Sequence, residues 1–176
     1  MDIKKFKLSL PSLFLVSALM AFIAINVAYA ANLTSVGQIQ IVKAIKIEEV
    51  QRLNFGKIEK PTQTVDAAIS LNGTTSGSAT FIDTSEVAIG IFEILGSDTE
   101  SVNIKVTPMN NGPYMGYNKM EGKYGSTNIA NLFVGGANLQ PPGNGVQLDL
   151  AGSLKIRSTV PEGLHEPAFS LEVNYD

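Results

Sequence analysis

The sequence contains no cysteine, no tryptophan and a single histidine, His165. Without cysteine the chain cannot build a disulfide framework, and it cannot carry a lipid-modified cysteine behind a leader segment. One histidine, with no serine elbow or cysteine to serve, offers no candidate for nucleophilic catalysis. The G-x-S-x-G, H-E-x-x-H, P-loop and G-x-G-x-x-G patterns are also missing. We therefore expect a protein that is not an enzyme and that holds no metal or cofactor.

Long apolar runs are confined to the first 30 residues. A lysine-rich start leads into an apolar run over residues 13–27, which is followed by the small-x-small sequence of residues 28–30. This order predicts a secretory signal cleaved after Ala30. The alternative is an uncleaved membrane anchor, but the run is shorter than the about 20 residues that a spanning helix usually needs. We expect export to the periplasm, the cell surface or the medium, with no stable membrane span after cleavage.

Charge of either sign is sparse, with 13 basic and 16 acidic residues and a net charge of −3. Removal of residues 1–30 would take away three lysines and Asp2, which leaves 10 basic and 15 acidic residues. An acidic surface of this kind does not favour nucleic acid or an anionic membrane. The remaining 146 residues suffice for one domain, residues 31–176, with a sizeable core.

The mature chain has no convincing amphipathic helix, whereas apolar residues repeatedly alternate with polar ones. Short segments of this kind, separated by turn residues, predict a single antiparallel β-sandwich, Ig-like or pilin-like, of about eight or nine strands. The strands are expected within residues 37–55, 64–71, 79–82, 87–95, 101–106, 132–134, 146–156 and 168–175.

For some of these strands the sequence leaves two interpretations open, and for others it predicts the position or the partner. Residues 43–52 would also suit a helix, although the spacing of the isoleucines favours a strand. Residues 87–95 are apolar at nearly every position, which predicts a central strand. We expect this strand to form a hairpin with residues 101–106, and residues 64–71 to form one with 79–82 across a long loop. Residues 146–156 form either one strand bent at Gly152 or two strands in succession.

Residues 109–128 lose the alternation and are rich in asparagine, glycine and proline, which predicts a long irregular loop. Tyr114, Tyr117 and Tyr124 lie in it. Tyrosine offers rigid contact area with a polar tip, so the three would form an adaptable surface for a glycan or a protein. The alternative is a loop folded over the end of the sandwich with its tyrosines half buried.

The last strand alternates most clearly. Phe169, Leu171, Val173 and Tyr175 share one face, and polar residues lie between them. This strand either closes the chain's own core or borders a surface that a partner covers.

Two short elements of the chain carry a family resemblance: Leu53-Asn54-Phe55-Gly56 and the terminal Val173-Asn174-Tyr175. Together with the V-G-G run in residues 132–136, their order resembles the bacterial secreted family known as domain of unknown function 4402. That family is similar in layout to spore-coat-U-like and archaic chaperone–usher pilins. The chain departs from those pilins in lacking cysteine and in having Gly163-Leu164-His165 where a G-Y element is common.

The resemblance implies a fimbria-like subunit in which a segment of one copy completes the sandwich of another. Leu33, Gly37, Ile39 and Ile41 share a parity and would form the donor strand. The last strand would then border the groove and offer the surface that a periplasmic chaperone contacts. The alternative is a self-complete module that binds a glycan or protein through residues 109–128. The two hypotheses differ in whether residues 37–47 complete the chain's own sandwich.

Overall fold

The structure is a computed structural model, and it describes residues 38–109 and 112–176. By its internal contacts the chain divides into Met1–Ile39 and Gln40–Asp176, and the described strands all belong to the second unit. The expected leader, residues 1–30, lies outside the described residues. The described part is all-β and has no helix, which confirms the predicted fold class. It has twelve strands rather than eight or nine, because several two- or three-residue strands escape sequence patterning.

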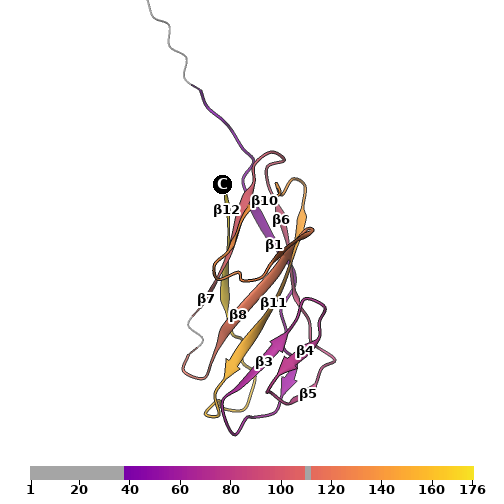
Figure 1. Cartoon of the computed structure of the whole chain (residues 1–176), viewed down its shortest axis with the longest axis vertical. Helices are drawn as coiled ribbons and strands as arrows, with labels where there is room; N and C mark the ends of the chain where they lie inside the picture. Colours follow the sequence, from indigo (N-terminus) through magenta and orange to yellow (C-terminus); the bar gives the residue numbers. More distant parts are fainter. Residues whose placement is uncertain (1–37, 110–111) are drawn as a thin grey trace, which may run out of the picture. The chain divides into compact units, whose positions relative to one another are not determined.

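The larger sheet has the strand order β1-β6-β11-β3-β4, with β8 paired to β11 and β9 paired to β8. Figure 1 shows the long strands β8 and β11 side by side. The bounds of these strands are β1 Lys46–Gln51, β3 Val65–Ile69, β4 Thr75–Gly77, β6 Gly90–Leu95, β8 Met115–Tyr124, β9 Thr127–Ile129 and β11 Val146–Ile156.

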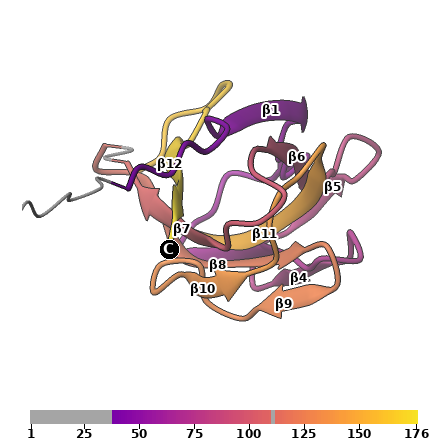
Figure 2. The same cartoon turned by 90° about the horizontal axis from the view of Figure 1, so that it is seen from above.

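The second sheet has three strands in the order β10-β7-β12, and all its pairs are antiparallel. Its members are β7 Val102–Pro108, β10 Gly136–Leu139 and β12 Phe169–Tyr175. A short pair, β2 Lys57–Ile58 with β5 Phe81–Asp83, completes the described strands. Figure 2 shows the two main sheets as the two layers of a sandwich.

Strand β11 organises the larger sheet. It pairs with β6 along its first half, with β3 along its second half, and with β8 on its other edge. It is one continuous strand through Gly152, which decides between the two sequence interpretations. A Cβ at this glycine would lie 2.5 Å from Met120 Sδ and 2.8 Å from the Lys119 carbonyl oxygen. Only glycine therefore allows β8 to approach this closely.

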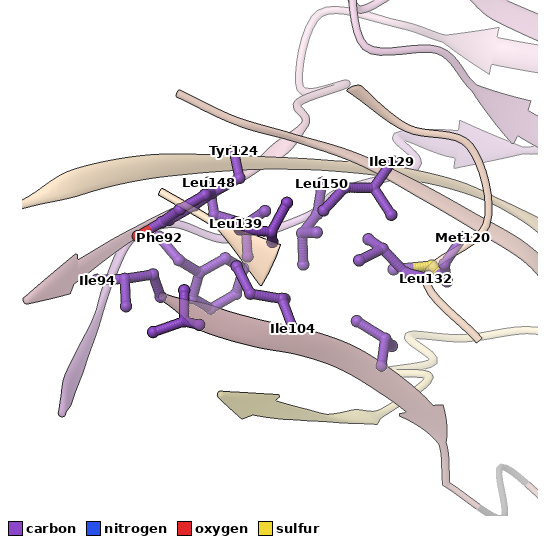
Figure 3. Close-up of a cluster of buried hydrophobic side chains, with 12 residues drawn as sticks. Phe92, Ile94, Ile104, Met120, Tyr124, Ile129, Leu132, Leu139, Leu148 and Leu150 are labelled. Atoms are coloured by element: carbon purple, nitrogen blue, oxygen red, sulfur yellow. The ribbon is translucent and has the colours of Figure 1, made fainter. Parts of the chain in front are cut away.

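The core lies between the two sheets, and Figure 3 shows most of it as one continuous cluster of apolar side chains. Each strand that faces the core contributes alternate residues, as the period of two requires. This cluster consists of Phe92, Ile94, Val102, Ile104, Val106, Met120, Tyr124, Ile129, Leu132, Leu139, Leu148 and Leu150. A second cluster around Phe55 and Ile69 lies between β3, the end of β11 and the residues that follow β1.

The L-N-F-G element ends the first strand region as its residues suggest. Phe55 is buried in the second cluster, and Asn54 forms an isolated bridge with Ala88. Gly56 has φ 72°, and its amide donates a hydrogen bond of 2.8 Å to Asn54 Oδ1. The element is therefore a turn that only glycine closes without strain.

Both predicted hairpins are wrong in their partners. Strands β6 and β7 follow each other in sequence but lie in different sheets, so residues 96–101 cross the sandwich instead of turning a hairpin. Strand β3 pairs with β4, inside the expected turn, while β5 pairs with β2. Alternation tells which residues are buried, but it does not tell which neighbouring strand they join.

Residues 109–128 are not the expected irregular loop. Half of them form the ten-residue strand β8, and β9 begins at Thr127. Asparagine and glycine weaken an isolated strand, but pairing with most of β11 stabilises this one, and context of this kind overrides propensity. The expected short strand at residues 132–134 is a turn, and β10 follows it.

The expected strand within residues 37–55 is shorter than its pattern suggested. Only Lys46–Gln51 forms β1, which excludes the helical alternative there. Residues 38–45 belong to no strand, and Gly37 lies outside the described residues. The first isoleucines of the alternating series therefore do not complete the sandwich.

Candidate functional site

Strand β12 has the predicted alternation, but its apolar face is only half covered. Leu171, Val173 and Tyr175 are half-buried, as is Phe169. The β7 partners of Leu171, Val173 and Tyr175 are almost fully buried, at 0% exposure for Val106 and Val102 and 1% for Ile104. The apolar side chains of β12 are therefore much less buried than those of the neighbouring strand β7.

The drop in burial occurs because β12 is the outermost strand of its sheet. Among the described residues it pairs only with β7. Its other edge presents the alternating N–H and C=O groups of a strand that no described strand joins. An edge of this kind is a ready template for another strand.

The same loss of cover occurs at β1 in the opposite sheet. Ile47 is the direct partner of Ile94 on β6, so both side chains face the core. Ile94 has no exposed surface, whereas Ile47 is 38% exposed. Glu49 pairs with the buried Phe92 in the same way and is itself exposed. The core-facing side of β1 is therefore uncovered.

Contacts at both ends show that β1 and β12 border the same side of the sandwich. At one end Tyr175 Oη donates a hydrogen bond to the carbonyl oxygen of Lys43, just before β1. At the other end Arg52, just after β1, forms an ion pair of 3.0 Å with Glu166, just before β12. Figure 2 shows the two strands on one side with no described strand between them. We call β12 and the core-facing residues of β1 the open side.

The segment before β1 exposes the apolar residues that the sequence suggested as a donor. Ile39 and Ile41 are each 87% exposed, and Val42 is 41% exposed. Leu33 and Gly37, the other two members of the expected donor strand, lie outside the described residues. The described end of the segment therefore has two large apolar side chains of one parity and no strand partner within residues 38–45.

The three tyrosines do not form one exposed surface. Tyr114 is 37% exposed, whereas Tyr124 is fully buried in the core. Tyr117 donates a hydrogen bond of 3.2 Å to the Pro167 carbonyl oxygen and stacks edge-to-face on Phe169, with ring centroids 5.7 Å apart. Burial raises the pKa of Tyr117 to about 12. Tyr117 therefore supports the start of β12 and does not project into solvent.

Sequence reasoning missed two parts of the open side. Ile47 shares the parity of the isoleucines before it, but parity cannot show that the facing sheet ends before covering it. Alternation places Tyr175 on the apolar face of the last strand and says nothing of its hydroxyl group. Its contact with Lys43 joins residues far apart in sequence, and no local pattern predicts such a contact.

The histidine and the acidic side chains form no metal-binding arrangement in the part of the chain that the structure describes. His165 is half-buried, and its Nε2 lies 2.8 Å from the Pro161 carbonyl oxygen. Within residues 38–109 and 112–176 no three His, Cys, Asp or Glu residues are placed to hold a metal ion. No described segment forms a helix long and apolar enough to cross a membrane.

Comparisons with protein-family models, curated proteins and solved structures found no match to this chain. The resemblance to the domain of unknown function 4402 family stays a prediction from the sequence. Any function must therefore be argued from the open side itself.

Proposed function

We propose that this protein is a non-enzymatic structural subunit, exported to the cell surface, that assembles by β-strand complementation between copies of itself. The observation that carries the proposal is the combination of an uncovered sandwich side with an exposed apolar segment that joins no strand. Ile47 on β1 and the apolar face of β12 lack cover, and Ile39 and Ile41 lack a place in the core. A donor strand from a second copy would satisfy both at once.

The donor segment has the chemistry that burial requires. Residues 31–42 contain no charged side chain. An uncharged strand can enter a partly buried site without the large desolvation penalty of an ionised group. Its alternate residues Ile39 and Ile41 would face the core, and fully burying one such side chain is worth about 1.5–3 kcal/mol.

The acceptor offers both kinds of contact that strand addition uses. The outer edge of β12 supplies main-chain hydrogen bonds, and the half-buried Leu171 and Val173 flank the positions for donor side chains. The same edge is an aggregation hazard in a subunit that has not assembled. The proposal therefore includes a periplasmic chaperone that covers β12 before assembly.

Cysteine cross-linking tests the proposal directly, because the chain has no native cysteine. One preparation carries Ile39→Cys and another carries Val173→Cys. After mixing and mild oxidation, we expect a disulfide-linked dimer containing one chain of each kind. The matched control pairs Ile39→Cys with Val134→Cys, which is 79% exposed but lies in the turn before β10, beyond β7 from β12.

A second variant separates assembly from folding. Deletion of residues 31–42 removes the donor but none of the described strands. We expect the shortened chain to fold and to form no heat-resistant ladders. Cross-linking no stronger than that of the Val134→Cys control, together with ladders in the shortened chain, would exclude strand complementation by this segment.

The alternative is a self-complete module that binds a glycan or protein. It draws support from a surface pocket of ≈ 250 Å³ beside β8, lined in part by Tyr117, Lys155 and Arg157. Binding to a glycan array that survives deletion of residues 31–42 but is lost in Lys155→Ala/Arg157→Ala would favour this second function. Tyr124 is buried and takes no part in it.

A further inference from the structure

We propose that a polar cluster at one end of β12 prevents the N-terminal segment from complementing its own sandwich, so that it is available only to a second copy. The inference rests on the proposed function and deepens it, since it names the partner as another molecule of this chain. We call the cluster the exit clamp. It consists of Ser97, Thr99, Glu100 and Tyr175, which hold Gln40 and Lys43.

Tyr175 is the centre of the exit clamp. Its hydroxyl oxygen accepts a hydrogen bond of 2.7 Å from the amide of Ser97, and its proton is donated to the Lys43 carbonyl oxygen. One side chain thus joins the end of β12, the crossing that follows β6 and the segment before β1. Both hydrogen bonds depend on the hydroxyl group alone.

Glu100 holds the segment at a second point. Its Oε1 accepts a hydrogen bond of 2.7 Å from Gln40 Nε2 and another of 3.2 Å from Thr99 Oγ1. The Glu100 amide in turn donates to Ser97 Oγ at 3.3 Å. Ser97 is 7% exposed, so the base of the exit clamp is buried and fixed.

The position of Glu100 decides where the segment can lie. Val102 pairs with Tyr175, and the Asp176 amide donates to the Ser101 carbonyl oxygen. Glu100 therefore lies beyond the end of β12, in the direction opposite to Val173.

Ile41 lies between the two held residues, Gln40 and Lys43. It is fixed near the end of β12 and cannot lie beside Leu171 or Val173 of its own chain. A self-complementing strand would need Ile39 and Ile41 beside those residues. A second copy has no such restriction, because its segment approaches from outside. The exit clamp thus prevents the segment from folding back onto its own sandwich and leaves it available for assembly with a second copy.

The test uses the full chain with Tyr175→Phe, which keeps the ring but removes both hydrogen bonds. Tyr114→Phe is the matched control, since Tyr114 is 37% exposed and its hydroxyl has no hydrogen bond to another described residue. Two quantities are measured: hydrogen exchange of the Ser97 amide, which donates to the Tyr175 hydroxyl oxygen, and the ratio of heat-resistant ladders to folded monomer. With two hydrogen bonds lost, we expect exchange to be at least about fivefold faster and the ladder ratio to fall by a similar factor in Tyr175→Phe.

Each outcome is decisive. If Tyr175→Phe matches Tyr114→Phe in both measurements, the exit clamp does not exist. If exchange rises but the ladder ratio stays unchanged, the hydrogen bonds exist but do not direct assembly, and the inference is wrong. If the unmodified chain forms no ladders, the proposed function fails. In that case an Ile39→Cys/Val173→Cys chain that forms an internal disulfide without Tyr175→Phe would also overturn the exit clamp.

Discussion

Gly96 shows how closely single residues are fitted at the end of β12. A Cβ at this position would lie 2.5 Å from Tyr175 Oη and 2.8 Å from Pro142 Cγ. Because real Cβ atoms do not approach so closely, Gly96→Ala must displace the tyrosine or the proline. We expect a loss of about 1–3 kcal/mol in the free energy of unfolding, measured by chemical denaturation.

Gly116→Ala is the control for this prediction. Its Cβ would meet nothing within 4 Å, although Gly116 lies within a strand and Gly96 just after one. Alanine loses less backbone entropy than glycine on folding, so this variant should be neutral or slightly more stable. Equal stability of the two variants would mean that the close approach at Gly96 is not maintained in solution.

Tyr124 and Tyr117 should respond oppositely to loss of their hydroxyl groups. Tyr124 Oη is buried and has no hydrogen-bond partner among the described residues, whereas Tyr117 donates to Pro167. An unsatisfied buried polar group costs free energy, while a satisfied one contributes about 0.5–1.5 kcal/mol. We expect Tyr124→Phe to leave the unfolding free energy unchanged or raised, and Tyr117→Phe to lower it. Destabilisation of both variants by the same amount would contradict this assignment.

At the scale of elements, a substitution on β1 should affect assembly much more than folding of the isolated subunit. Ile47 faces the core side but is 38% exposed, so Ile47→Asp should cost the isolated subunit less than about 1 kcal/mol. In an assembled pair the same carboxylate would be buried beside the donor strand without a partner. We therefore expect Ile47→Asp to abolish ladders on a gel while the subunit stays folded by circular dichroism.

Val50→Asp is the matched control on the same strand, because Val50 is 65% exposed. It should keep both the fold and the ladders. If the two variants assemble equally well, the core-facing side of β1 is not part of the contact between subunits.

The elements differ in how far the sequence predicts them. Strands β3, β11 and β12 follow from alternation, and β6 follows from a nearly continuous apolar run. Strand β8 does not, because its glycines and asparagines resemble a loop and its stability comes from β11. The sheet that each strand joins also depends on contacts far apart in sequence. This is why the expected hairpin of β6 with β7 is wrong.

The candidate site was predictable in its strands but not in its geometry. The parity of Ile39 and Ile41 and the alternation of β12 are visible in the sequence. That β1 and β12 border one side of the sandwich is not visible there, because the bonds of Tyr175 to Lys43 and of Arg52 to Glu166 span more than a hundred residues. Chain topology places these residues together, and no local pattern encodes it.

For the whole molecule, net charge predicts how assembly should depend on salt. The chain carries a net charge of −3, which would become −5 without residues 1–30, while the donor segment is uncharged. Approaching copies therefore repel each other, and the donor adds no attraction between charges. Raising the ionic strength from 0.01 M to 0.15 M shortens the screening length from about 30 Å to about 8 Å and removes most of this repulsion. We expect the initial rate of ladder formation, measured by gel densitometry at fixed protein concentration, to rise a few-fold over this range.

The chain lacking residues 31–42 should form no ladders at any salt concentration. A rate that falls with added salt would mean instead that subunits meet through oppositely charged surfaces, and that the uncharged donor segment does not control their encounter.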